Sequence, residues 1–379
     1  MRVAFICPGL GHGGAETQII AMAAALVRQG HAVLTLVLFP GTARVADLRA
    51  KGVRVVEFEK RRRLDLGLIL KLRAELSNFG ADLVHGFLFD GNLYARLAAM
   101  GLGVTVLASE RNSDYTLRPA QQVAHRLTRW LSDGVIANSH HGAALARSMY
   151  PGLKREHVHV VWNGIDWRAI RARAAVARGL RVRLGLPEQT KIVCFVGAIK
   201  PQKDYALAIK VVQTVLRMSE NAWAAVFVGA EFPKMAGYRS LDYEGSQAYA
   251  GAVERDFNEL PTGRAFRLGQ INDVVEVMAQ SNVLLSTSLH EGFPNVVLEA
   301  MAVGTPVVST SYSDIARILP FEWQVVGSRE AGELAAAVMR AEADGPCVIR
   351  AQQQWVETHA DIDATVNLLA TIYAGYRRA

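Results

Sequence analysis

Residues 290–308 read HEGFPNVVLEAMAVGTPVV. The polar start of this stretch has the composition of a loop, and Pro294 suits the first position of a following helix, where no backbone N–H is needed. The apolar runs 283–286 and 305–309, on either side, have the length and composition of buried strands. A strand, a helix and a second strand in succession predict a parallel sheet.

The same alternation of apolar runs and amphipathic stretches covers most of the chain. In the first half, the runs that predict strands are 3–7, 32–39, 53–58, 83–85, 105–108 and 135–137. The pattern restarts in the second half, with runs at 191–196, 224–228, 265–268, 283–286 and 305–309. We therefore expect an α/β protein with two doubly wound parallel sheets.

The length of 379 residues also favours two domains, since single domains cluster at ~100 to 200 residues. The turn signal 162–166 separates the two series of strands. We expect an N-terminal domain over 1–166, a C-terminal domain over 167–360, and a terminal helix, 361–379, folding back onto the first domain. Ligands of open parallel sheets bind at the carboxyl ends of the strands, so two Rossmann-like domains should face a central cleft.

Composition restricts the function. With 51% hydrophobic and 20% charged residues the chain is an ordinary globular protein, and its net charge of +7 favours an anionic partner. No nucleic-acid-binding module is recognisable, so nucleic acid is the least favoured partner. Cys7, Cys194 and Cys347 lack metal-ligand spacing and predict buried thiols in a reducing compartment. The N-terminal apolar run is too short for a signal peptide, and no run approaches the ~20 residues of a spanning helix, which predicts a cytoplasmic protein.

The helix expected after Pro294 has the features of a diphosphate site. The amides of Asn295, Val296 and Val297 should be unpaired at its N-terminus, where the helix dipole also favours an anion. Glu299, one to two turns further, could accept hydrogen bonds from both hydroxyls of a ribose. The alternative for Glu299 is a purely structural carboxylate near a helix N-terminus.

Glu291, in the loop before this helix, should lie nearer the sugar. Two glutamates could instead indicate the carboxylate pair of a glycosidase. Because Glu291 precedes the helix and Glu299 lies on it, their spacing does not place them on either side of one bond. A hydrolase is therefore less favoured than a transferase.

A glycine-rich loop follows the first strand. Residues 9–16 read GLGHGGAE and satisfy the pattern G-x-G-x-x-G before a helix, which lets the backbone approach a phosphate. A simple tight turn is the alternative. A nicotinamide enzyme would need an acidic residue at the end of the second strand, but that strand ends at Pro40-Gly41. A nicotinamide-dependent dehydrogenase is thus disfavoured.

Lys203 follows the strand 191–196 and the segment 197–202. A point charge there could reach phosphate oxygens, and a lysine at a helix start is otherwise mildly unfavourable with the dipole. A solvated surface lysine is the alternative.

The segment 290–308 resembles the E-x7-E motif of the retaining GT-B glycosyltransferases of family 4. The resemblance extends over nearly the whole chain, since other landmarks follow in the order of that family: Gly13 to Glu16, Ser109 to Asn112, Ala137 to Ser139, Asn163 to Asp166 and Pro201 to Asp204. It implies a GT-B fold and transfer of a sugar from a nucleotide-diphosphate donor with retention of configuration. It also implies front-face attack, without a metal, a cofactor or a covalent nucleophile.

The resemblance assigns roles to residues of the second domain. Glu299 would hold the ribose, Glu291 would contact the donor sugar, and Lys203 would pair with the diphosphate. The donor site would also include Gly292, Phe293, Pro294, Asn295 and Val296, with Gly13 and Gly14 closing from the opposite domain.

Two positions depart from the family pattern. Ala198 stands where the family usually has an arginine, so Lys200 is a candidate substitute. The segment 311–317 replaces the usual Asp, glycine-rich turn and Glu, so the donor sugar cannot be carried over.

On the acceptor side, His85, Glu110 and Arg111 are expected at the carboxyl ends of strands, and we assign His85 and Arg111 to the catalytic set with Glu291 and Lys203. Asp361-Ile362-Asp363 is the only D-x-D sequence, and a capping role at the start of the last helix is favoured over a metal site.

The basic run 60–63 precedes six apolar residues within 64–72. This arrangement fits either a solvated face or a peripheral patch on an anionic membrane. We therefore expect a glycosyltransferase whose acceptor is a glycan on a lipid carrier, in polysaccharide or glycoconjugate biosynthesis. The alternatives are a transferase acting on a soluble sugar or metabolite, and a non-catalytic nucleotide-sugar-binding protein.

Overall fold

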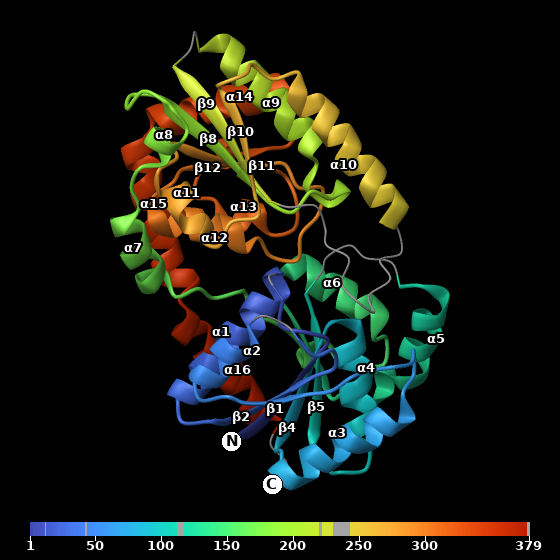
Figure 1. The fold of residues 1–379 in the computed structure, drawn as a ribbon. Helices are drawn as coiled ribbons and strands as arrows, with labels where there is room; N and C mark the ends of the chain where they lie inside the picture. Colours follow the sequence, from blue (N-terminus) through green and yellow to red (C-terminus); the bar gives the residue numbers. More distant parts are fainter. Residues whose placement is uncertain (12, 42–43, 112–116, 220–221, 230–242, 377–379) are drawn as a thin grey trace. The chain divides into compact units, whose positions relative to one another are not determined.

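The computed structural model describes residues 1–11, 13–41, 44–111, 117–219, 222–229 and 243–376. The chain forms two compact units (Figure 1). Unit 1 comprises Met1–Ile165 and His359–Ala379, and unit 2 comprises Asp166–Thr358. The expectation of two Rossmann-like domains built on parallel sheets is confirmed.

Unit 1 contains a seven-stranded sheet in the order β3-β2-β1-β4-β5-β6-β7, with every described pairing parallel. Its strands are β1 (Arg2–Cys7), β2 (Ala32–Val37), β3 (Arg54–Glu57), β4 (Leu83–Phe87), β5 (Thr105–Glu110), β6 (Gly134–Ala137) and β7 (Val158–Val160). The strand order reverses direction between β1 and β4, which makes this the topological switch point of the sheet.

Helices cover both faces of this sheet because successive residues of each strand point to opposite faces. Val3, Phe5 and Cys7 of β1 pack with α1 (Gly14–Arg28) and α16 (Ile362–Gly375). Ala4 and Ile6 pack on the other face with α3 (Leu66–Phe79) and α4 (Leu88–Ala99). The remaining helices are α2 (Val45–Ala50), α5 (Pro119–Thr128) and α6 (His140–Met149).

The terminal helix α16 returns to the first unit and lies beside α1 (Figure 1). Ile165 forms a parallel bridge with Asp361, and Arg28 of α1 pairs with Asp363 at 2.7 Å. Asp361 accepts hydrogen bonds from the amides of Asp363 and Ala364, at 3.0 and 3.2 Å, so the capping interpretation of this D-x-D sequence is confirmed. Residues 377–379 of the expected helix lie outside the described part of the chain.

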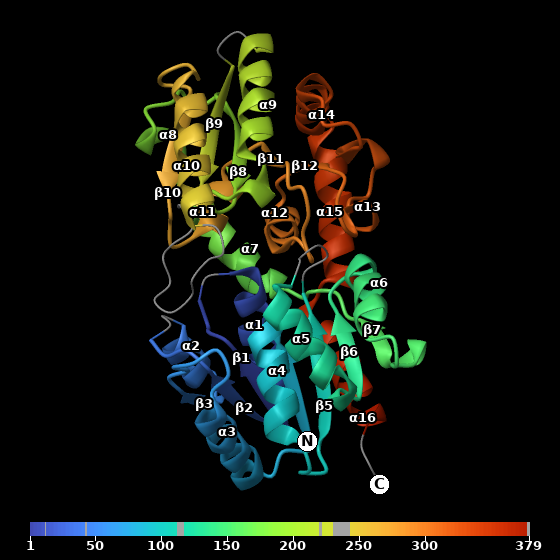
Figure 2. The same ribbon diagram turned by 90° about the vertical axis from the view of Figure 1, so that its right-hand side faces the viewer.

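Unit 2 contains a six-stranded parallel sheet in the order β10-β9-β8-β11-β12-β13. Its strands are β8 (Lys191–Val196), β9 (Trp223–Val228), β10 (Ala265–Gly269), β11 (Val283–Ser286), β12 (Val307–Thr310) and β13 (Val325–Val326). Helices α9 (Tyr205–Met218), α10 (Tyr243–Asn258) and α14 (Ala331–Ala343) pack on one face, and Figure 2 shows α9 and α10 side by side. Helices α7 (Trp167–Val176), α11 (Val274–Ala279) and α12 (Asn295–Val303) pack together beside β8, β11 and β12. The order reverses between β8 and β11, the second switch point.

Gly91 on α4 gives a stability prediction for the first switch point. A Cβ atom at this position would lie 2.3 Å from the carbonyl oxygen of Ile6, far inside van der Waals contact. We expect Gly91→Ala to lower the free energy of unfolding by about 1–3 kcal/mol, as overpacking does, measured by urea denaturation. Gly67→Ala on α3 is the matched control, since its Cβ would meet nothing closer than 3.5 Å. Equal stability of both variants would contradict the close packing of α4 on β1.

Candidate active site

The second switch point brings together residues distant in sequence. β8 and β11 are parallel neighbours, so the segments that follow them start at the same edge of the sheet. Lys203 lies at the end of the short 3-10 helix Pro201–Lys203, after β8, and Glu291 lies in the loop after β11. The crevice outside the carboxyl ends of strands at a switch point is where open α/β sheets bind ligands.

Lys203 and Glu291 form a salt bridge at this edge. Nζ of Lys203 donates to Oε1 of Glu291, and their side chains are only 16% and 14% exposed. Ser288 Oγ also donates to Oε1, at 2.9 Å, and Gln202 Nε2 donates to Oε2 at 3.3 Å. Two of the predicted catalytic residues therefore lie in contact, with limited access to water.

Hydrogen bonds hold the two loops together. The amide of Leu289 donates to the carbonyl of Gln202 at 2.8 Å, and Gln202 Nε2 donates to the carbonyl of His290 at 2.7 Å. Thr287 Oγ1 lies 2.9 Å from the carbonyl oxygens of Lys203 and Asp204. A network of this kind fixes the position of a charged pair before any ligand arrives.

Asp204 anchors the same loop at a strained backbone position. Its φ of 48° is unusual for a residue other than glycine. Its carboxylate accepts a hydrogen bond from the amide of Leu207 at the start of α9, and its other oxygen lies 2.5 Å from Nη2 of Arg329. Strain held by such contacts is typical of functional sites.

Helix α12 begins at Asn295, one residue later than expected, with Pro294 in the capping position. Its partly exposed residues Asn295, Val296, Glu299 and Val303 share one face, since they recur every three or four residues. Glu299 therefore lies on the accessible face that starts at the N-terminus of the helix. The expectation that the amide of Val297 is unpaired is wrong, because it donates to the carbonyl of Pro294 at 3.1 Å.

Gly292, Phe293 and Pro294 are buried, with Phe293 only 6% exposed. Of the donor residues predicted here, the structure thus makes Asn295, Val296 and Glu299 accessible through side chains. Gly292, Phe293 and Pro294 shape the loop, and they can offer a ligand only their backbone groups.

The segment that departs from the family pattern packs against this loop. Ser313, with a φ of 43°, donates from Oγ to the carbonyl of Gly292 at 3.0 Å. The hydroxyls of Tyr312 and Ser286 lie 2.9 Å apart, and burial, aided by Glu291, raises the pKa of Tyr312. Tyr312 is thus a neutral group beside Glu291.

In unit 1 the glycine-rich loop leads into α1, with Gly13 as N-cap and Gly14 as first helical residue. The Glu16 carboxylate lies over Gly13, since a Cβ there would be 2.2 Å from Oε2 of Glu16. The helix N-terminus thus already has a carboxylate of its own chain nearby. His12 of the quoted motif lies outside the described residues.

Arg111 follows β5 and is half-buried at the carboxyl edge of the first sheet. Its guanidinium donates to Ser109 Oγ at 3.1 Å, to Asn163 Oδ1 at 2.9 Å and to the sulfur of Met22 at 3.3 Å. It also lies 5.4 Å from the ring centroid of Phe87. Burial lowers its pKa to about 10. Asn112, the next residue of the motif, lies outside the described part.

His85 does not lie at the sheet edge, and that prediction is wrong. The strand continues to Phe87, and His85 is fully buried at its centre. Nδ1 is 2.6 Å from the hydroxyl of Tyr373, and the ring packs edge-on against Phe5. Alternation along β4 directs His85 to the face covered by α1 and α16, so it has no access to an acceptor.

The burial of His85 predicts a pH dependence of stability. Desolvation, then the charge of Arg111, lowers its pKa well below 6.5. Below that value the unfolded chain binds more protons, so stability falls with falling pH, by about 1.4 kcal/mol per unit from this group. We expect His85→Gln to flatten the slope in urea titrations between pH 6.5 and 5, while His141→Gln, at an exposed position, leaves it unchanged. Parallel slopes for wild type and His85→Gln would contradict this.

The basic run 60–63 was expected to be a surface patch as a whole. Its first residue, however, has a buried side chain. Lys60 pairs with Asp90 at 2.9 Å and its side chain is 8% exposed. Arg61 pairs with Glu59 at 2.8 Å. In the segment that follows, Leu68 and Leu72 of α3 pack in the core, whereas three leucines are more than half exposed: Leu64, Leu66 and Leu70.

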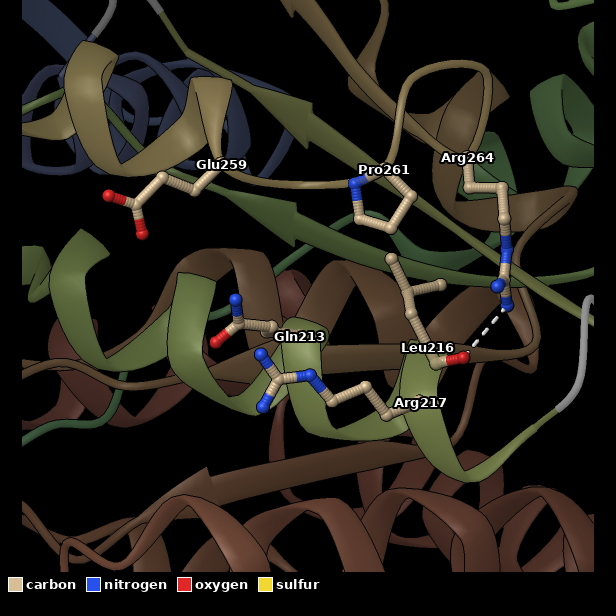
Figure 3. A pocket seen from close by; sticks show the side chains of 6 residues that line it. All are labelled: Gln213, Leu216, Arg217, Glu259, Pro261 and Arg264. Atoms are coloured by element: carbon tan, nitrogen blue, oxygen red, sulfur yellow. Dashed lines mark hydrogen bonds between the residues drawn. The ribbon is translucent and has the colours of Figure 1, made fainter.

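A separate hollow of about 370 Å³ lies elsewhere in unit 2 (Figure 3). It is lined by the C-terminal half of α9 and by the segment 259–264. Arg264 donates to the carbonyl of Leu216 at 3.1 Å and to that of Trp223, the first residue of β9, at 3.1 Å. This hollow is therefore at the amino end of the strands, opposite the edge that carries Lys203 and Glu291.

Among the residues that the structure describes, no three His, Cys, Asp or Glu side chains gather as metal ligands would. No described helix is long and apolar enough to cross a membrane.

Sequence reasoning missed the supporting residues Thr287, Ser288, Tyr312 and Arg329. Thr287 and Ser288 directly follow β11, so their place at the carboxyl edge could have been inferred. Tyr312 lies in the segment 311–317, which directly follows β12, so its place at this edge could also have been inferred. Arg329 gave no signal, because only the packing of a later segment brings it to this edge.

Two doubly wound parallel sheets in one chain, each with polar residues at its switch point, define the class of two-domain Rossmann-like proteins. The model of Glycosyltransferase Family 4 matches residues 12–168, and that of Glycosyl transferases group 1 matches residues 178–359. The chain belongs to the group 1 glycosyltransferases of the GT-B fold, and it is a glycosyltransferase.

Individual relatives agree with this assignment. The 2-deoxystreptamine glucosyltransferase of Streptomyces kanamyceticus is 25% identical, over 94% of this chain and 98% of its own. The alpha-maltose-1-phosphate synthase of Mycolicibacterium smegmatis is 28% identical over 63% of this chain and 62% of its own. Anabaena HepE in complex with UDP has the same fold, with a TM-score of 0.81 at 20% identity, covering 99% of this chain and 100% of that one.

Proposed function

We propose that the protein transfers a sugar from a nucleotide-diphosphate donor to an acceptor with retention of configuration. The salt bridge of Lys203 and Glu291 at the switch point carries this proposal. A cation at this edge can pair with a diphosphate, and a carboxylate beside it can accept hydrogen bonds from a donor sugar, which supports the proposal. The accessible face of α12 that includes Glu299 supports a ribose contact.

The division of roles follows from chemistry. As the glycosidic bond breaks, negative charge builds on the leaving diphosphate, and Lys203 stabilises it. Glu291 orients Lys203 and accepts hydrogen bonds from the donor sugar. The leaving phosphate deprotonates the acceptor on the front face, so neither a metal nor a cofactor takes part.

Relatives of this chain have names that indicate soluble acceptors, such as 2-deoxystreptamine. Our leading acceptor is nevertheless a glycan on a lipid carrier, in polysaccharide or glycoconjugate biosynthesis, handled by a cytoplasmic enzyme. The exposed leucines after the basic run support peripheral membrane contact, since Leu66 and Leu70 are 68% and 67% exposed on one helix face. A soluble sugar or metabolite is the alternative acceptor.

The donor is tested by thermal unfolding with UDP, GDP, ADP and their sugars. A ligand that binds only the folded protein raises the midpoint temperature of unfolding. We therefore expect the nucleotide and sugar nucleotide of one base to raise this temperature more than the others. Turnover with a suitable acceptor, and the anomeric configuration of the product by NMR, then test retention. Binding without turnover across acceptors would favour a non-catalytic nucleotide-sugar-binding protein.

Membrane contact gives its own prediction. Replacing Arg62 and Arg63 by glutamate should weaken binding to phosphatidylserine vesicles roughly 30-fold, since each basic residue near anionic lipid contributes ~1 kcal/mol. The exposed pair Lys154 and Arg155, replaced in the same way, is the control. Vesicle sedimentation with equal partitioning of both variants and wild type would exclude this patch as the membrane contact.

A further inference from the structure

Arg111 is a partly buried cation without a carboxylate partner among the described residues. Its hydrogen-bond acceptors are a hydroxyl, an amide oxygen and a thioether sulfur, and none of these carries a charge. A guanidinium has five N–H donors, so two remain, and the bond to sulfur is weak. Burying a cation without a counterion costs free energy, which an anionic ligand would offset.

In the described part of the chain, the groups around Arg111 do not supply that negative charge. Its ring contact is Phe87, and the nearby His85 and Tyr373 are held neutral by burial, which lowers the first pKa and raises the second. Glu110, the preceding residue, points to the other face of β5, where its carboxylate accepts a hydrogen bond from Tyr150 at 3.4 Å.

The position of Arg111 is that of a ligand site. β5 lies next to β4, whose carboxyl end faces the switch point between β1 and β4. Beside Phe87, Leu88 has a φ of 60°, a conformation uncommon for a residue other than glycine. The Arg111 guanidinium thus lies over Phe87, at the carboxyl end of β4, which borders the switch point of the first sheet.

We propose that Arg111 binds a phosphate group of the acceptor. The inference rests on the proposed function and specifies its acceptor as phosphate-bearing. A planar guanidinium with two N–H groups that no described residue accepts suits bidentate binding of a phosphate. The phosphate can belong to a free sugar phosphate or to a polyprenyl phosphate in a membrane, and both present the same oxyanion.

The test compares Arg111→Met with wild type. Calorimetry with glucose 6-phosphate and glucose probes the soluble source, and sedimentation with phosphatidylcholine vesicles containing polyprenyl phosphate probes the lipid source. We expect wild type to bind one phosphate probe, and Arg111→Met to bind it roughly 10- to 150-fold more weakly. Glucose and vesicles without polyprenyl phosphate should not show this difference.

Arg129→Met is the matched control, because Arg129 is also partly buried and donates to a neutral acceptor, the carbonyl of Met149, at 2.9 Å. An equal loss in both variants, or no binding of either phosphate probe by wild type, would overturn the proposal. Binding of UDP, GDP and ADP, measured in the same samples, is a separate readout. If one of these nucleotides binds and Arg111→Met retains phosphate affinity, the acceptor inference fails while the donor proposal stands. If none of the three binds, the proposed function itself fails.

Discussion

Lys203→Ala is expected to slow sugar transfer by roughly 10²- to 10³-fold, the usual effect of removing one preorganised group that stabilises transition-state charge. The lysine forms a salt bridge with Glu291 at the carboxyl edge of the second sheet. Glu291 should keep its place in the variant, because Ser288 and Gln202 still donate to its two oxygens. The loss should therefore appear mainly in kcat, with a weaker affinity for the nucleotide diphosphate.

Initial rates and calorimetry with nucleoside, monophosphate and diphosphate would measure this effect. Nucleoside affinity should stay at the wild-type value, since Lys203 is assigned to the phosphates. Lys210→Ala, an exposed lysine on α9, is the control and should transfer at the wild-type rate. A Lys203→Ala enzyme with unchanged kcat would remove Lys203 from the catalytic set.

Glu299→Gln is expected to weaken nucleotide binding roughly 10- to 150-fold, the effect of losing a charge-assisted hydrogen bond of ~1.5 to 3 kcal/mol. The substitution preserves size but removes the charge and one acceptor. Because the proposed partner is the ribose, nucleoside, monophosphate and diphosphate should all weaken by a similar factor. This pattern differs from that of Lys203→Ala, which should spare the nucleoside.

The same calorimetric series distinguishes the effect of Glu299→Gln from that of Lys203→Ala. Glu357→Gln is a suitable control, since this glutamate pairs with Arg171 on α7 and is assigned no ligand. Circular dichroism would show that the fold is intact. Unchanged affinity of Glu299→Gln for all three ligands would mean that the ribose assignment is wrong and that the structural alternative holds.

The parallel sheets could be predicted because their strands are short apolar runs separated by helical patterns. The predicted run 191–196 and the run 283–286 coincide with β8 and β11. The edge strands β7 and β13 were missed, since three and two residues are too short to show a pattern. The boundary of β4 was set two residues too early, and that error placed His85 at the sheet edge rather than in the core.

The sequence by itself determined the alternation of strands and helices, the loop and helix around Glu299, and the chemical types available for a site, because these depend on local propensity and periodicity. Only the tertiary structure decided which of these groups meet. Lys203 and Glu291 are 88 residues apart and come into contact because strand order makes β8 and β11 neighbours. Burial decided the environment of the charged groups. Lys60 and His85 are buried, and Arg111 has no counterion among the described residues, because the environment of a charge depends on packing from distant segments.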